Sequence, residues 1–243
     1  MSTTHLDAVQ RRTVRTLSAA QVVGGVGNGA AISVGALLVK DISGSSAWAG
    51  LATTMLTLGA AVSALPLAAL SSHRGRRPSL TLGWSGSVVG AVLVVVGAEA
   101  DSLSLTLLGM FVCGFNSATN LQSRYAAADL AGPATVGRSL SIVVWSTTVG
   151  AVLGPNLTAP GAAVAGRLGV PPLSGPFVFS AAAWLCGAAI MYVALRPDPL
   201  VLAKSVPAPA TTRAVTRRGI GSALPIVRRN PAALTGIVTV ACA

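Results

Sequence analysis

The chain consists of long apolar stretches separated by short polar ones, and this pattern predicts membrane-spanning helices. Six stretches are close to the roughly 20 residues that a helix needs to cross a bilayer. Helices are expected because backbone polar groups in lipid must be satisfied within the protein. We therefore predict an all-α, polytopic membrane bundle of about six transmembrane helices. The expected spans are Leu17–Val39, Ala47–Leu70, Leu80–Ala98, Leu103–Gln122, Ser139–Ala159 and Pro176–Leu195.

Polar segments flank this six-helix block, which covers residues 17–195. Residues 1–16 are expected to form a cytoplasmic N-terminal tail. Residues 196–230 are rich in Pro, Thr and Arg and predict a basic cytoplasmic linker, with or without a short surface helix. Residues 231–243 are apolar again but too few to cross a bilayer. They are either a peripheral end or the start of a seventh transmembrane helix, and we favour the second.

The distribution of basic residues predicts the orientation of the block. Fifteen of the 17 Lys and Arg residues lie in the N-terminal tail, in the loops after the second and fourth spans, and after the sixth span. The positive-inside rule places this side in the cytoplasm. Both ends of the block are therefore expected at the cytoplasmic face of the inner membrane, which requires an even number of spans.

Composition argues against several classes of function. Only 9% of residues are charged, against about a quarter in soluble proteins. The net charge of +11 would suggest a nucleic-acid partner in a soluble protein, but here the basic residues lie between apolar spans, so no nucleic acid is expected. There is no nucleophile–base arrangement and no metal-like cysteine spacing, so we expect no enzyme, no cofactor and no metal. The cysteines lie in apolar runs: Cys113, Cys186 and Cys242.

Polar residues gather in the fourth span. Asn116, Thr119 and Asn120 fall on one helical face. Such a stripe either lines a water-filled cavity and binds a substrate, or bonds neighbouring helices, and both interpretations stay open. Asn28 in the first span is a further candidate for a cavity. The small residues around it favour close helix packing: Gly24, Gly25, Gly27 and Gly29.

A short basic loop, Ser71–Ser79, joins the second and third spans and predicts an antiparallel hairpin. Gly75 suits a turn conformation that other residues avoid. Arg76 and Arg77 can pair with acids or hold the last carbonyls of a helix. A plain positive-inside loop explains the same residues equally well.

The fifth span carries Gly150, Gly154 and Pro155. The two glycines are four residues apart, so they form a face on which another backbone can approach closely. Pro155 removes an internal hydrogen bond and is expected to bend the helix. Ordinary helix packing would account for the same three residues.

Together these features resemble the major facilitator superfamily of secondary transporters. The family's first signature, Gly-x-x-x-Asp-Arg-x-Gly-Arg-Arg, is similar to residues 68–77, in which Gly75, Arg76 and Arg77 match. The resemblance implies that these residues form a conformational switch with an acid at the cytoplasmic end of the fourth span, here Asp129, which we expect to pair with Arg76. At the other signature positions the chain has Ala68, Ser72 and His73.

The fifth span is similar to the family's antiporter signature, with Gly150, Gly154 and Pro155 as matching residues. This likeness implies export and a helix that seals the closed state. The family's Arg-x-x-x-Gly pattern of the fourth span corresponds to Met110–Gly114, which has the glycine but not the arginine. No charged residue lies at the centre of any span, so the sequence indicates no proton-coupling site.

The resemblance covers nearly the whole chain and implies the N-terminal half of an exporter of small organic compounds that works by alternating access. Its partners would be membrane lipid, a small-molecule substrate, and a missing C-terminal half or a second copy. Asn28, Asn116 and Asn120 are the expected substrate-binding residues. The alternatives are a truncated or repurposed membrane protein without transport activity, or a half-size unit that must dimerise.

Overall fold

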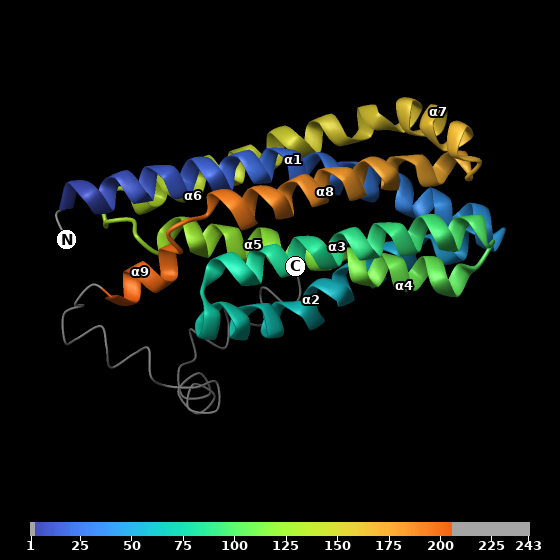
Figure 1. The fold of residues 1–243 in the computed structure, drawn as a ribbon. Coiled ribbons are helices and arrows are strands. Elements are labelled where there is room, and N and C mark those ends of the chain that lie inside the picture. The colour runs from blue at the N-terminus through green and yellow to red at the C-terminus, as the bar shows by residue number, and fades with distance from the viewer. Residues whose placement is uncertain (1–2, 206–243) are drawn as a thin grey trace, which may run out of the picture. The chain divides into compact units, whose positions relative to one another are not determined.

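A computed structural model describes residues 3–205, and every regular element in this range is helical (Figure 1). The expectation of an all-α bundle is confirmed. The end of the expected linker and the whole of the expected seventh helix, 206–243, lie outside the described residues. The α-helices are α1 Thr3–Ser43, α2 Ala49–Arg74, α3 Arg76–Glu99, α4 Leu103–Cys113, α5 Phe115–Ala128, α6 Val136–Leu153, α7 Thr158–Leu168, α8 Gly175–Ala194 and α9 Pro199–Ser205. Short 3₁₀ turns lie between some of them: η1 Ser46–Trp48, η2 Gly154–Leu157 and η3 Pro172–Ser174.

Five helical stretches in the described part are long and apolar enough to cross a membrane. The fourth predicted span is not among them because Gly114 divides it into α4 and α5. The N–H of Gly114 still donates to the carbonyls of Met110 and Phe111, at 3.2 and 3.1 Å, so the chain continues in a nearly helical conformation. Taken together, α4 and α5 form the fourth predicted span and bring the number of spans in the described part to six. The five stretches are Leu6–Ser43, Ser46–Arg74, Arg76–Glu99, Val136–Leu168 and Pro172–Ser205.

Two helices extend well beyond their predicted ends. The expected tail is helical from Thr3 onward, because Val9 and Val14 are buried against the bundle. The fifth span continues through η2 and α7 to Leu168, where Gly161 packs against the start of α8. Both extensions depend on contacts with segments far away in the sequence. Such contacts cannot be predicted from the hydrophobicity of the segment itself.

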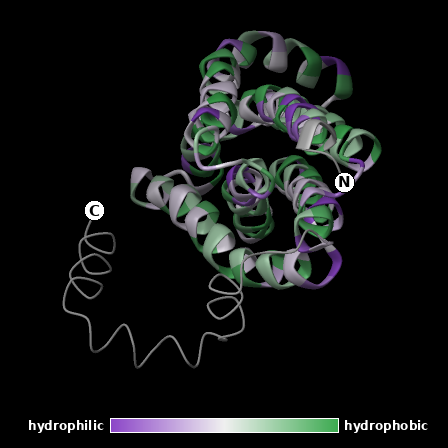
Figure 2. Ribbon diagram, turned by 90° about the vertical axis from the view of Figure 1, so that its left-hand side faces the viewer, coloured by the Kyte–Doolittle hydropathy of each residue, from purple (hydrophilic) through white to green (hydrophobic). Residues whose placement is uncertain are grey.

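Successive spans run antiparallel, so their connections alternate between two ends of the bundle (Figure 1). The N-terminus, the α2–α3 turn, the α5–α6 connection and α9 lie at one end, which we call the basic end. The connections α1–α2, α3–α4 and α7–α8 lie at the other. Figure 2 faces the basic end and shows hydrophilic segments among mostly apolar helices. The structure thus places on one side the loops that the sequence grouped by their charge.

Two tryptophans packed on glycines form the centre of the core. Trp84 of α3 and Trp184 of α8 are fully buried. The Trp84 ring fills the space that side chains at Gly24 and Gly187 would occupy, and Trp184 does the same at Gly27. The indole N–H of Trp184 also donates to the carbonyl of Gly24 at 3.2 Å. The packing role expected for the glycines of the first span is confirmed.

Candidate functional site

The α2–α3 turn at the basic end is built around Gly75. Its φ of +98° and ψ of 176° lie in a region that is essentially open only to glycine. Its N–H donates to the carbonyl of Ser71 at 2.9 Å and closes α2, and α3 begins at the next residue. The turn conformation expected from the sequence is therefore present.

Arg76 and Asp129 form a bidentate ion pair between the start of α3 and the end of α5. Nε of Arg76 lies 2.8 Å from one carboxylate oxygen and Nη2 lies 3.1 Å from the other. The remaining nitrogen, Nη1, donates to the side-chain oxygen of Gln122 at 2.8 Å. The two charged side chains are only 13% and 10% exposed, so water and salt screen them weakly. The structure thus brings together the two residues that the sequence indicated as partners.

Asp198, directly before α9, contacts the same turn. One of its carboxylate oxygens accepts a hydrogen bond from the backbone N–H of Arg77 at 2.7 Å. The other accepts from the N–H groups of Leu200 and Val201, at 3.0 and 3.2 Å. A single carboxylate therefore caps the first turns of both α3 and α9, where it also meets the positive end of each helix dipole. A side chain at Gly75 would lie 2.5 Å from this carboxylate, so close contact is a second reason for glycine there.

The side chain of Arg77 reaches the end of α8. Its Nε donates to the backbone carbonyl of Tyr192 at 2.8 Å, and its guanidinium lies 4.5 Å from the centroid of the Tyr192 ring. This combines a helix C-terminal contact with a cation–π interaction. Sequence reasoning included the carbonyl role for Arg77 but missed Asp198. The signal was an Asp-Pro pair before a helix start, which is a common N-terminal capping pattern.

We expect Asp198→Ala to lower the free energy of unfolding by about 1–2 kcal/mol, the usual effect of losing a helix cap. The two N-terminal turns would lose their shared acceptor. Thermal unfolding of the purified protein measures the change. Asp41→Ala, which removes an exposed acid near the end of α1, is the matched control. Equal midpoints for the two variants would contradict the capping role.

Gly150 and Gly154 lie where the α6–η2 segment crosses α1. A Cβ at Gly150 would lie 2.8 Å from the Cα of Gly25, and one at Gly154 would lie 2.6 Å from the Cα of Gly29. The two backbones are therefore in direct contact, as in other helix pairs with small residues at the interface. Pro155 follows, and there α6 gives way to the 3₁₀ turn η2. The regular α-helix is interrupted here, and the expected bend stays a prediction.

The three asparagines expected to bind substrate differ in burial. Asn116 is 3% exposed, whereas Asn28 and Asn120 are half-buried. The hydroxyls of Thr119 and Ser123 on the same helix donate to carbonyls one turn earlier. Within the described residues, Nδ2 of Asn116 and Oδ1 of Asn120 are buried and have no hydrogen-bond partner. The polar stripe therefore contains two buried amide atoms that lack a hydrogen-bond partner.

Comparison with known proteins places these features in one family. The sequence profile of the Major Facilitator Superfamily matches residues 17–243. The chain belongs to the major facilitator superfamily. This membership makes it a multi-pass membrane protein of a transporter family.

This chain of the major facilitator superfamily aligns with less than half of each of three curated relatives. An uncharacterized MFS-type transporter of Bacillus subtilis, YdeG, is 39% identical over 201 residues, which are 83% of this chain and 47% of the relative. A second, YddS, is 40% identical over 196 residues, 81% of this chain and 45% of the relative. The riboflavin transporter RfnT of Brucella anthropi is 31% identical over 147 residues, 60% of this chain and 37% of the relative. The chain spans about half the length of the first two relatives. No solved structure matches it significantly.

Proposed function

We propose that the chain is the N-terminal half of a secondary active transporter that exports small organic compounds across the cytoplasmic membrane. Superfamily membership supports this proposal, as do the antiparallel spans, which are five long apolar stretches and the α4–α5 pair. In transporters of this class the substrate binds near the midplane, between two halves that rock against each other. A second half, or a second copy of this chain, would complete the site.

The two amide atoms of α5 that lack a hydrogen-bond partner are the main support for the proposed substrate site. Leaving a buried donor or acceptor without a partner costs about 1–3 kcal/mol. A substrate or water that bonds Nδ2 of Asn116 and Oδ1 of Asn120 removes this cost. The neighbouring hydroxyls already have partners, so the asparagines are the groups free to recognise a ligand. Asn28 of α1, half-buried, is the third residue of this proposed site.

Two other features suit the conformational cycle. We assign Gly75, Arg76, Arg77 and Asp129 to a switch that holds one state, because their contacts join α3, α5 and α8 at the basic end. The direct backbone contact at Gly150 and Gly154, followed by Pro155, suits a helix that seals the closed state.

Asn120→Leu in the intact transporter should raise the substrate concentration for half-maximal transport by about two- to tenfold. Leucine keeps the branched shape of the side chain but removes one hydrogen bond of about 0.5–1.5 kcal/mol. Transport into membrane vesicles measures the change, with protein abundance checked by immunoblot. Riboflavin is the first compound to test, because RfnT is named as its transporter.

Asn156→Leu is the matched control for this experiment. Asn156 of η2 is exposed, and its amide already donates at 3.2 Å to the carbonyl of Val152, four residues earlier in α6. Transport by this variant should equal that of the wild type. Unchanged half-saturation in Asn120→Leu, at wild-type abundance, would remove Asn120 from the substrate site.

A further inference from the structure

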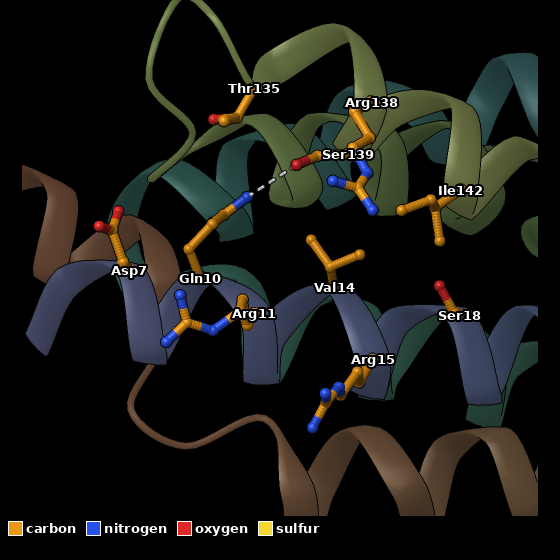
Figure 3. A pocket seen from close by; sticks show the side chains of 10 residues that line it. All are labelled: Asp7, Gln10, Arg11, Val14, Arg15, Ser18, Thr135, Arg138, Ser139 and Ile142. Carbon is orange, nitrogen blue, oxygen red and sulfur yellow. Dashed lines mark hydrogen bonds between the residues drawn. The ribbon is translucent and has the colours of Figure 1, made fainter. Parts of the chain in front are cut away.

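A cleft of about 620 Å³ opens at the basic end between α1 and α6 (Figure 3). Arg11 and Arg15 of α1 line it, together with Arg138 of α6. Figure 3 shows Arg138 reaching from α6 toward α1 across this space. None of the three guanidinium groups has an ion pair or side-chain hydrogen bond within residues 3–205. Asp7 is the one acid in the lining, so the lining carries three positive charges and one negative, a net charge of +2.

The cleft also contains a fixed hydrogen-bond acceptor. Gln10 is 8% exposed, and its Nε2 donates to the carbonyl of Ala127 at 2.8 Å and to Oγ of Ser139 at 3.3 Å. These bonds hold the amide in place from α5 and α6. Its Oε1 is buried and has no partner in the described part of the chain. The site therefore offers a fixed acceptor, closed to solvent in this conformation, near the guanidinium group of Arg138.

The position of the cleft along α1 corresponds to the lipid headgroup layer. The apolar span of this helix is predicted to begin at Leu17. Arg11 lies six residues earlier, about 9 Å along the axis at 1.5 Å per residue. Headgroup regions add several ångströms to each side of the hydrocarbon core. At the membrane side of the cleft, Val14 and Ile142 present apolar surface that suits the start of an acyl chain.

We propose that this cleft binds the headgroup of an anionic phospholipid that carries a hydroxyl group, as phosphatidylglycerol does. The phosphate oxygens accept from Arg138 and from Arg11, because guanidinium forks match phosphate geometry. A headgroup hydroxyl donates to Oε1 of Gln10. The positive-inside rule explains basic residues on this side, but it requires neither a fixed acceptor nor a cavity beside them.

Native mass spectrometry of the intact purified protein tests this proposal. The protein is titrated separately with phosphatidylglycerol, phosphatidylcholine and inorganic phosphate. Wild-type protein should retain phosphatidylglycerol in preference to the other two. Arg138→Gln should weaken phosphatidylglycerol binding about fivefold, the effect of one basic residue near an anionic lipid surface. The phosphatidylglycerol affinity of Arg138→Lys should lie between those of the wild type and Arg138→Gln, since lysine keeps the charge but loses the planar pair of donors.

Arg12→Gln is the matched control, because Arg12 is exposed on α1 and does not line the cleft. It should change binding less than twofold, and both variants should keep the wild-type melting midpoint. Equal losses in Arg12→Gln and Arg138→Gln would overturn the site in favour of general surface charge. Inorganic phosphate binding as tightly as the lipid would show a site for soluble anions instead. No retained lipid in wild-type protein would also overturn the proposal.

Discussion

Arg76→Ala is expected to lower the free energy of unfolding by about 3 kcal/mol, because it leaves the carboxylate of Asp129 without its cation. That carboxylate is only 10% exposed, and Gln122 loses its donor as well. Thermal unfolding in detergent measures the loss. Transport should fall with it at equal protein abundance, because the proposed switch loses its central contact.

Arg74→Ala is the control for this prediction. Arg74 is exposed in the same loop, and its substitution removes the same charge. Its midpoint should stay near that of the wild type. Asp129→Ala and the double variant complete the cycle. If the pair acts as a unit, the double variant should be no less stable than Arg76→Ala. Additive losses would show that the two residues act separately.

Arg76→Lys distinguishes the ion pair from its geometry. Lysine keeps the charge but cannot form the two parallel bonds to Asp129 together with the third bond to Gln122. The variant should therefore lie between Arg76→Ala and the wild type in midpoint. Wild-type stability in Arg76→Lys would mean that charge alone matters at this position.

Gly150→Ala is expected to lower the free energy of unfolding by about 1–3 kcal/mol, although alanine is the better helix former. A Cβ at this position would overlap the backbone of α1, so the helices must move apart. The neighbouring contact between Gly154 and Gly29 would open as well, and with it the proposed seal. The melting midpoint and the passive leak of the substrate through vesicles report these two effects.

Gly137→Ala offers the same change on the same helix, at an exposed position with nothing within 4 Å of the new atom. It should leave stability unchanged or raise it by up to about 1 kcal/mol through helix propensity. The two alanine variants are thus expected to move the midpoint in opposite directions. A drop of equal size in both would show that α6 is sensitive to any added methyl group.

Both large effects arise from contacts that join separate spans. The Arg76–Asp129 pair joins α3 to α5 at the basic end. The glycine contact joins α1 to the end of α6 and the start of η2. Asp198 adds α9 to the first of these sites, so the segment that follows the sixth span is tied to the turn between α2 and α3. A movement of that segment would therefore act directly on the proposed switch.

The sequence by itself determined the number, order and alternation of the spans. Length and hydrophobicity of each stretch are local properties, and the bilayer converts them directly into helices. The turn at Gly75 was also predictable, because it depends on one residue's allowed conformations. The family signatures then indicated which arginine and which acid to pair, although no sequence rule gives their distance.

Only the tertiary structure decided which distant groups meet. Gln10 bonds a carbonyl 117 residues away, and this contact helps to hold the polar start of the chain against the bundle. Asp198 accepts from Arg77 across 121 residues. Burial of Trp84 against Gly24 and Gly187 requires that α1, α3 and α8 pack against one another. Such contacts depend on how helices pack in three dimensions, and the periodicity of one helix shows which residues share a face but not which helix covers it.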